Sequence, residues 1–222
     1  MVALRVVSFN VRALRDDRAA VVRTLRSLDA DIACLQEVPR FVRWRSRNAA
    51  LARESNLLYA GGGGTTGGTA MYAAVRVDVR DVREYRLSRT PGLHRRGAVG
   101  ARVHKAGASA VVAAFHLGLD AEERGRHRSE LLSFVDRYGD GTVVLAGDVN
   151  EPPDHPTWQS LAAELTDAGA GDKTPTFPTP SPRHRIDGIF VRGARITSYQ
   201  VFDGPDVRAA SDHHPVVADL DL

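Results

Sequence analysis

Short runs of apolar residues rich in Val and Ile recur along the whole 222-residue chain, and they limit its possible folds more than any other feature. Each run stops at a polar or turn-forming residue, which is typical of β-strands. The expected strands are 4–9, 31–36, 69–75, 82–87, 98–103, 110–115, 142–146, 186–191, 196–202 and 216–220. A chain with so many strands has to bury their apolar faces in packed sheets.

Helical patterns are fewer. Asp16 and Asp17 precede a segment whose apolar residues share one face, which predicts a capped amphipathic helix. Three more helices are expected at 41–53, 122–137 and 157–165. The early strand–helix units predict parallel neighbouring strands, and the turn at 104–109 predicts an antiparallel hairpin. The sequence therefore favours an α+β fold, in which two mixed sheets pack face to face with helices outside them.

The chain shows no break in composition and no internal repeat, so one domain spanning residues 1–222 is expected. Hydrophobic residues make up 43% and charged residues 26%, a balance that allows a well-buried core. The glycine cluster 61–68 and the proline-rich stretch 174–185 are expected to form loops.

Several classes of protein are disfavoured. The lone Cys34 rules out a disulfide framework and a cysteine-based zinc site. The N-terminus has no signal-peptide pattern, and no apolar run is long enough to cross a membrane. A soluble, cytoplasmic protein without a membrane span is expected.

The basic residues are almost all arginines. Of 30 basic residues only Lys105 and Lys173 are lysines, and the net charge is +3. Arginine suits phosphate because its planar fork can bind two oxygens at once. Biased codon usage would produce the same composition, so the charge alone identifies no partner.

Acids, amides and imidazoles stand at the ends of six expected strands, or at an inward position within them. They are Asn10, Glu37, His116, Asp148 with Asn150, Asp187, and Asp212 with His213. Burying such a group without a partner costs roughly 2–7 kcal/mol. One shared site would satisfy all of them together.

Each residue also has an ordinary structural interpretation. Asn10 and the segment 147–150 could form turns, Glu37 could be an exposed carboxylate, and His116 could be a hydrogen-bonded core histidine. Asp187 is harder to explain this way, because a carboxylate in an apolar strand needs a partner. A single site explains the whole series more simply.

The same residues lie in motifs that resemble the endonuclease/exonuclease/phosphatase superfamily. The motifs run nearly end to end: Ser8-Phe-Asn-Val-Arg12, Leu35-Gln-Glu-Val38, Gly67-Gly-Thr-Ala70, Arg95-Arg-Gly-Ala98, Phe115-His-Leu117, Gly147-Asp-Val-Asn150, Arg185-Ile-Asp-Gly-Ile-Phe190 and Ser211-Asp-His-His-Pro215. The last three motifs, in this order, are the most specific. The resemblance implies a four-layered α/β/β/α sandwich with the site at one end of the two sheets.

The resemblance also implies roles for the site residues. Glu37 would be the principal ligand of Mg²⁺, for which Mn²⁺ could substitute, with Asn10 and Asp212 nearby. Oxygen ligands suit Mg²⁺, and whether one or two metal ions act stays open.

The remaining roles concern the phosphate and the attacking water. Asp148 and Asn150 would orient both, His213 would act with Asp187, and His116 would donate a hydrogen bond or a proton. His213 is preferred to His214 because it occupies the family's Asp-His position. Arg95 or Arg96 would contact the substrate phosphate.

Three functions remain open from the sequence. The first is a nuclease, endo- or exonuclease, acting on DNA or RNA. The second is a phosphatase or phosphodiesterase acting on a small metabolite or lipid headgroup. The third is a non-catalytic protein that kept the fold, which is disfavoured because every catalytic position is filled. The chain lacks the tryptophan-containing form of the first motif and the long insertions of abasic-site nucleases, and a monomer is expected.

Overall fold

The computed structural model describes residues 1–222 as two six-stranded β-sheets. The first sheet has the order β11-β12-β1-β2-β4-β3 and the second the order β5-β6-β7-β8-β10-β9. The first sheet comprises β1 (Ala3–Asn10), β2 (Ile32–Gln36), β3 (Leu58–Gly63), β4 (Thr69–Ala73), β11 (Arg195–Val201) and β12 (Val216–Asp221). The second comprises β5 (Asp78–Arg86), β6 (Gly97–Lys105), β7 (Ala108–His116), β8 (Val143–Asp148), β9 (Thr166–Asp167) and β10 (Asp187–Arg192).

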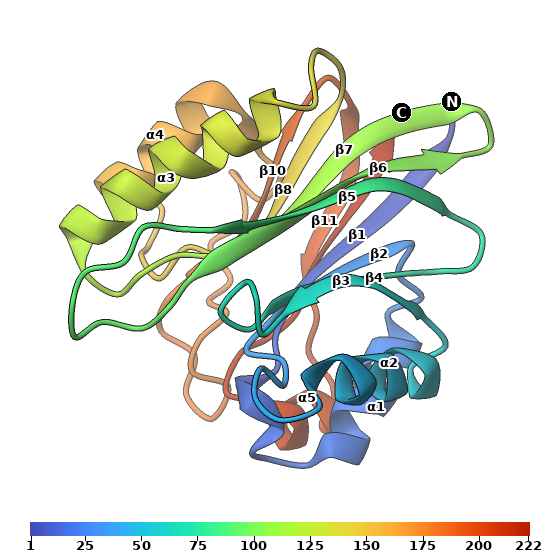
Figure 1. Ribbon diagram of the computed structural model, residues 1–222, viewed down its shortest axis with the longest axis vertical. Helices are drawn as coiled ribbons and strands as arrows, with labels where there is room; N and C mark the ends of the chain where they lie inside the picture. Colours follow the sequence, from blue (N-terminus) through green and yellow to red (C-terminus); the bar gives the residue numbers. More distant parts are fainter.

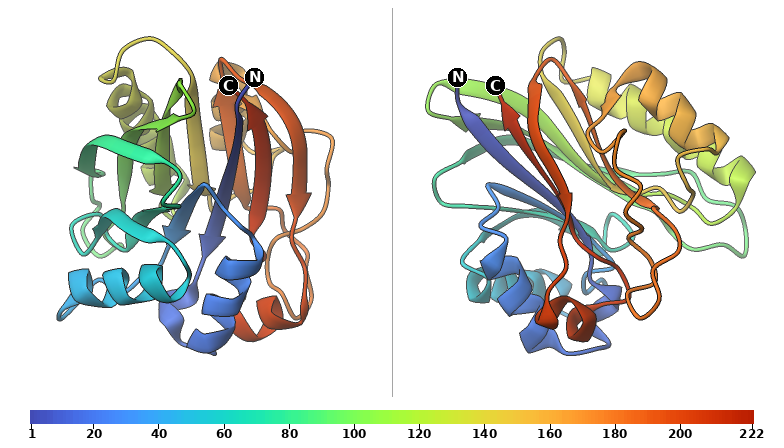
Figure 2. Two further views of the ribbon diagram at one scale, coloured as in Figure 1. Left: turned by 90° about the vertical axis from the view of Figure 1, so that its right-hand side faces the viewer. Right: turned by 180° about the vertical axis from the view of Figure 1, so that it is seen from behind.

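Helices cover the outer face of each sheet (Figure 1). On the side of the first sheet lie α1 (Arg18–Ser27), α2 (Trp44–Glu54) and α5 (Pro205–Ala210), and a short helical turn η1 (Arg12–Leu14) precedes α1. On the side of the second sheet lie α3 (Ala121–Asp136) and α4 (Pro156–Glu164). Figure 2 shows the same four layers from two other sides. The expected α/β/β/α sandwich is confirmed.

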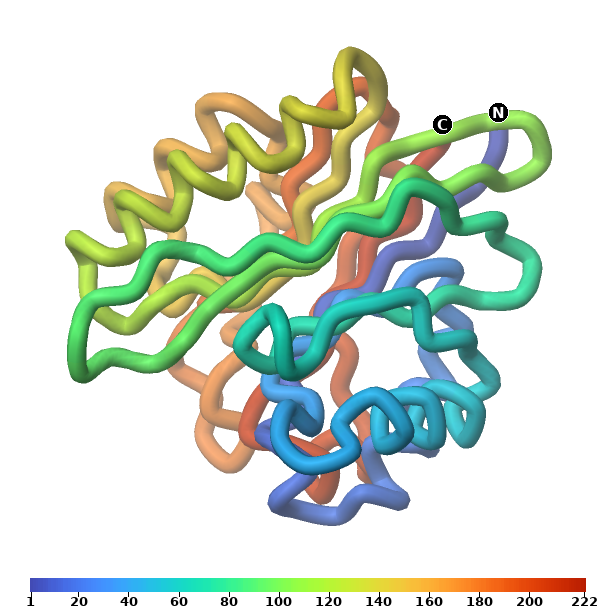
Figure 3. The backbone as a smooth tube through the Cα atoms, viewed as in Figure 1, coloured from blue at the N-terminus to red at the C-terminus, as the bar shows by residue number.

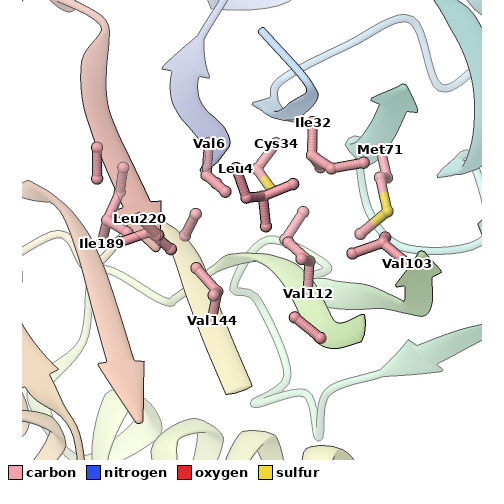
Figure 4. Close-up of a cluster of buried hydrophobic side chains, with 14 of the residues drawn as sticks. Leu4, Val6, Ile32, Cys34, Met71, Val103, Val112, Val144, Ile189 and Leu220 are labelled. Atoms are coloured by element: carbon pink, nitrogen blue, oxygen red, sulfur yellow. The ribbon is translucent and has the colours of Figure 1, made fainter. Parts of the chain in front are cut away.

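The innermost core lies between the two sheets (Figure 4). Leu4 and Val6 of β1 belong to the same apolar cluster as Val112, Val144 and Ile189 of the second sheet. Two further clusters join the sheets to the outer helices. Central strands are therefore buried on both faces, which is why their sequences are continuous apolar runs rather than alternating ones.

The strand directions bring the polar strand ends to one end of the molecule. β1 pairs parallel with β2, and β7 pairs parallel with β8, so the carboxyl ends of each pair coincide. β10 runs antiparallel to β8, with Asp187 opposite Asp148. β12 runs antiparallel to β1 and begins beside its carboxyl half. The expected parallel neighbours and the β6–β7 hairpin are confirmed.

The prediction of a loop at 61–68 is wrong for its first part, because Leu58–Gly63 forms β3. Glycine is uncommon in strands, but here the space leaves no room for a side chain. A Cβ at Gly62 would lie 2.3 Å from the Thr69 carbonyl oxygen, and one at Gly63 would lie 2.7 Å from the Trp44 ring. The expected loop at 174–185 is irregular as predicted and appears in orange in Figure 3.

Two short elements, β9 and α5, had no counterpart among the expected elements. The chain termini lie side by side, and the backbone groups of Val2 and Leu222 hydrogen-bond to each other. None of the helices has the length and apolar character needed to span a bilayer.

Candidate active site

A cavity of about 470 Å³ opens where the polar strand ends meet. Its walls come from both sheets and from the loops that follow their strands. Among the expected site residues, those that line it are Asn10, Glu37, Arg96, His116, Asp148, Asn150, Asp212 and His213. Asp187 lies directly behind His213, and Arg95 lies outside the cavity. The structure thus brings together all the expected residues except Arg95.

Asn10 links carboxylates from the two sheets. Its amide nitrogen lies 3.1 Å from Asp148 Oδ2 and 3.5 Å from Glu37 Oε1. Its amide oxygen accepts a hydrogen bond from the backbone N–H of Arg12 at 3.0 Å, which fixes the orientation of the amide. Asn10 therefore presents a donor to the carboxylates and holds both of them beside the cavity.

Asp148 lies at the centre of the site. Its Oδ1 accepts a hydrogen bond from the backbone N–H of Asn150 at 2.9 Å, and its Oδ2 lies 3.3 Å from His116 Nε2. Burial raises the pKa of Asp148 to about 7, and the charge of Asp187 adds to this, while His213 offsets part of it. Asp148 is thus a carboxylate that can exchange a proton near neutral pH.

Asn150 has a left-handed backbone conformation, with φ at 59°. Its side-chain nitrogen donates to the Leu117 carbonyl at 2.9 Å. Asparagine tolerates this conformation better than most residues. The turn Gly-Asp-Val-Asn therefore ends β8 and also places a second polar side chain at the cavity.

His116 is held as a neutral ring. Arg96 Nη1 lies 2.9 Å from His116 Nδ1, and because a guanidinium can only donate, Nδ1 must be the acceptor. The ring proton then sits on Nε2, which faces Asp148. Burial and the neighbouring Arg96 charge lower the pKa of His116 well below its usual value. His116 is consequently a neutral ring whose Nε2 lies 3.3 Å from Asp148 Oδ2.

His213 is in the opposite electrostatic situation. Its Nδ1 lies 2.9 Å from Oδ2 of the fully buried Asp187, and its Nε2 lies 4.0 Å from Asp148 Oδ2. Burial alone would lower the pKa of His213, but Asp187 outweighs it and raises the pKa to about 9. The ring of Phe177 packs beside it at a centroid separation of 4.7 Å. His213 is therefore a cation at neutral pH with Nε2 available to the site.

His214 does not line the cavity. It is buried, and its Nε2 lies 3.5 Å from Asp203 Oδ1. Of the two adjacent histidines, only His213 faces the carboxylates of the site.

Glu37 adopts a backbone conformation that is rare for its residue type, with φ at 55°. Such strain of about 1–3 kcal/mol persists where the surrounding structure imposes it, often at functional sites. The Glu37 carboxylate forms no ion pair with any arginine, lysine or histidine, and its hydrogen-bond partner is Asn10. An acidic group in a cavity without a cationic partner has the donor chemistry that Mg²⁺ prefers.

Two other acidic positions bear on a metal ion. Asp212 also lines the cavity, but its Oδ2 pairs with Arg12 Nε at 3.1 Å. Ligand atoms of Asp148, Asp187 and His213 lie within 4.8 Å of one another, close enough to hold an ion. Because Asp187 and His213 are already hydrogen-bonded to each other, proton handling suits this cluster better than metal ligation.

Sequence reasoning missed several residues that line the cavity, namely Arg15, Arg40, Phe41, His94, Leu119 and Phe177. Arg40 follows Glu37 by three residues and His94 precedes Arg96 by two, so their closeness to motif residues was the available signal. Phe41 and Leu119 are both largely exposed, with 71% and 66% of their surface accessible. They give the mouth of the cavity two apolar sides.

Known proteins resemble this chain along most of its length. The model of the Endonuclease/Exonuclease/phosphatase family matches residues 7–213. The "Uncharacterized protein YbhP" of Escherichia coli (strain K12) is 28% identical over 240 residues, which cover 97% of this chain and 91% of YbhP.

Solved structures share the fold at low sequence identity. An endonuclease/exonuclease/phosphatase from Bacteroides vulgatus has a TM-score of 0.85 at 19% identity, with all of both chains covered. The mannosyl-6-phosphatase of Bacteroides thetaiotaomicron VPI-5482 has a TM-score of 0.82 at 19% identity, covering 99% of this chain and 100% of the other. D. rerio TDP2, complexed with a single-strand DNA product, has a TM-score of 0.75 at 18% identity over all of both chains. Because the family model matches residues 7–213, the chain belongs to the endonuclease/exonuclease/phosphatase family, whose members are phosphoesterases.

Proposed function

We propose that this protein is an Mg²⁺-dependent hydrolase of phosphodiester bonds, with nucleic acid as its first candidate substrate. The observation that carries the proposal is the position of Asp148 between His116, which is neutral, and His213, which is protonated. Both histidines and Asp148 share one cavity with Glu37. The site draws on both sheets, which supports a single functional domain spanning residues 1–222.

Asp148 is the proposed general base. Its raised pKa, about 7, lets it accept a proton from water at neutral pH. Hydrogen bonds from Asn10 and from the Asn150 backbone hold the carboxylate in place. Asn150 would help to position the water and the phosphate, because its side chain lines the same cavity.

His213 is the proposed electrostatic partner of the phosphate. Asp187 keeps it protonated, so a cation faces the charge that develops on the phosphoryl oxygens in the transition state. His116 remains neutral, with its Nε2 3.3 Å from Asp148 Oδ2. Arg96 holds the His116 tautomer and lines the cavity with its own charge.

Glu37 is the proposed principal metal ligand, with Asp148 and Asp212 close by and Asn10 holding the carboxylates. A bound Mg²⁺, or Mn²⁺ in its place, would polarise the phosphoryl oxygens. Glu37 is a better candidate than Asp212 for the principal ligand, because the Glu37 carboxylate is unpaired and Arg12 partly neutralises that of Asp212.

A phosphatase acting on a small phosphorylated metabolite is the second candidate. The mannosyl-6-phosphatase, whose fold covers this chain from end to end, favours it, whereas TDP2 with its DNA product favours the nuclease. The exposed Phe41 and Leu119 at the cavity mouth suit a planar base or another apolar group beside the phosphate. We further propose that the protein acts as a monomer, since one chain completes the site, and in the cytoplasm, since its only cysteine is free.

A substrate panel with Mg²⁺ tests the proposal. Plasmid DNA, short DNA and RNA oligonucleotides, and phosphomonoesters are incubated with the parent protein and with Asp148→Ala and His213→Ala. We expect phosphodiester cleavage by the parent and at least a 100-fold loss in each variant, because each removes a group that acts in the transition state. His214→Ala is the matched control for His213. Parent-like turnover by either site variant, with folding verified by circular dichroism, would refute the assigned chemistry.

A further inference from the structure

A second, smaller pocket lies next to the catalytic cavity and has a volume of about 240 Å³. It is lined by Gly64, Thr65, Gly67, Arg86, Leu87, Arg89, Arg95 and Arg96, and we call it the arginine pocket. It shares Gly67 and Arg96 with the catalytic cavity, so the two spaces adjoin. Half of its lining residues are arginines and none is acidic.

The arginines of this pocket form no direct ion pairs. None of Arg86, Arg89, Arg95 and Arg96 forms a salt bridge, whereas arginines elsewhere, such as Arg185, bind carboxylates. Arg86 and Arg89 donate from Nε to the backbone carbonyls of Thr65 and Leu93, at 3.2 and 3.0 Å, which leaves the ends of their guanidinium groups available.

Arg96 gives a second indication of a missing partner. Only 9% of its surface is exposed, and its Nε is buried without any hydrogen-bond partner. Its Nη1 is engaged with His116, so the guanidinium spans from the catalytic histidine to the arginine pocket. A buried donor without a partner costs about 1–3 kcal/mol, and a bound anion would remove that cost.

The two pockets meet at Gly67 and Arg96, which line both of them. A Cβ at Gly67 would lie 2.4 Å from the Arg95 carbonyl oxygen, and the backbone has a φ of +69°. Glycine meets both conditions, so its backbone packs directly against the segment that carries Arg95 and Arg96. This close packing keeps the arginines of the second pocket beside the catalytic cavity.

We propose that the arginine pocket binds a second phosphate group of the substrate, beside the phosphate that is hydrolysed. This rests on the proposed function of the neighbouring cavity. Phosphate fits because guanidinium groups bind its oxygens in pairs, and because four arginines that form no salt bridge line one small pocket. The substrate then carries at least two phosphates, as in a nucleic-acid strand or a small bisphosphate. Arg95, for which the sequence predicted a contact with the substrate phosphate, lines this second pocket.

A binding experiment without metal tests the pocket independently of turnover. In excess chelator, fluorescence anisotropy measures the binding of a labelled single-stranded DNA hexanucleotide. A competition assay measures the binding of fructose 1,6-bisphosphate. The test variant is Arg86→Gln/Arg95→Gln. The control, Arg47→Gln/Arg53→Gln, removes the same two charges from exposed positions on α2, outside both pockets.

We expect the test variant to raise the Kd for at least one of the two ligands about tenfold, and the control to change it less than twofold. If the strand is the ligand, the magnitude of the slope of log K against log salt should also fall by about 0.7, because one phosphate contact is lost. Loss confined to the hexanucleotide identifies a strand, and loss confined to the bisphosphate identifies a small metabolite. Equal effects of the two double variants, or no binding of either ligand by the parent, would overturn the proposal.

Turnover separates this proposal from the proposed function. The test variant should raise the KM for a substrate with two phosphates. It should raise the KM for bis(4-nitrophenyl) phosphate, which has one phosphate, far less. If the parent hydrolyses no phosphoester while the binding difference persists, the proposed function fails and the phosphate pocket stands. If hydrolysis persists without any binding difference, the pocket fails alone.

Discussion

The two histidines of the site show how neighbouring charge decides the state of a buried residue. His116 and His213 are both almost completely buried and both lie within 4.0 Å of Asp148 Oδ2. Burial and the charge of Arg96 both lower the pKa of His116, whereas for His213 the charge of Asp187 outweighs burial and raises the pKa. Two residues of the same type thus supply a neutral ring on one side of Asp148 and a cation on the other.

These charge states predict a bell-shaped dependence of kcat/KM on pH. Asp148, the base, must be deprotonated, so activity should rise as pH increases through about 7. His213 must be protonated, so activity should fall as pH increases through about 9. The profile is measured on the preferred substrate at constant ionic strength. A profile that is flat from pH 6 to 10 would contradict these roles.

Asp187→Asn should move the alkaline limb of that profile to lower pH. Asparagine keeps the shape of the side chain but removes the charge that raises the pKa of His213, and burial then lowers it. Asp203→Asn, which faces His214, is the matched control and should leave the limb in place. An unchanged alkaline limb in Asp187→Asn would show that His213 does not produce it.

At the scale of elements, the strands could be predicted well and the site only in part. Central strands are continuous apolar runs, so the sequence marks them directly. β3 was missed because its glycines resemble a loop, and α5 because six residues give too little periodicity. Arg95 and Arg96 could not be separated from sequence, because neighbours in an extended segment point to opposite sides and only a structure shows which side faces the site.

Arg185, part of the motif that contains Asp187, has a structural role in anchoring β10. Its two terminal nitrogens bind both carboxylate oxygens of the buried Asp167 in β9, at 2.9 and 2.7 Å. Its guanidinium carbon also lies 4.8 Å from the centre of the Trp158 ring. The pair joins the edge strand β9 to the entrance of β10, two residues before Asp187.

Arg185→Met should lower the free energy of unfolding by about 3 kcal/mol, because it leaves the Asp167 charge buried without its partner. Asp167→Asn/Arg185→Met should cost less than Arg185→Met alone, since neither charge then remains. Urea denaturation of the parent, both single variants and the double variant measures the coupling. A loss below about 1 kcal/mol in Arg185→Met would contradict this account of the motif.

At the scale of the whole molecule, Asp31 ties the two sheets together at the end opposite the active site. Its carboxylate accepts hydrogen bonds from the Arg5 backbone at 2.8 Å, from Arg76 at 2.5 Å and from Lys105 at 2.6 Å. Lys105 belongs to β6 of the second sheet, whereas Asp31 immediately precedes β2 of the first. Burial alone would raise the pKa of Asp31, but these donors outweigh it and hold the pKa below its usual value.

A carboxylate whose pKa is lowered by folding stabilises the folded state at pH values above its pKa in the unfolded chain. That contribution is lost as the pH falls through its pKa in the folded state. Asp31→Asn should therefore reduce the free energy of unfolding by about 2 kcal/mol at pH 7. The difference from the parent should be full above about pH 4 and shrink below it. Urea denaturation from pH 2.5 to 7 measures it, with Asp140→Asn as an exposed control. A difference that grows as pH falls would have the wrong sign.

In the proposed function, Glu37 from one sheet and the Asp148 cluster from the other serve one metal-dependent centre for phosphoester hydrolysis. Titration of Mg²⁺ into metal-free protein, followed by the initial rate of phosphoester cleavage, tests it most directly. We expect no turnover in excess chelator, saturable recovery with Mg²⁺, and at least a tenfold higher Mg²⁺ requirement or a lost response in Glu37→Gln. The exposed Glu164→Gln should behave as the parent. Full activity in excess chelator, or a Glu37→Gln response identical to that of the parent, would contradict the account.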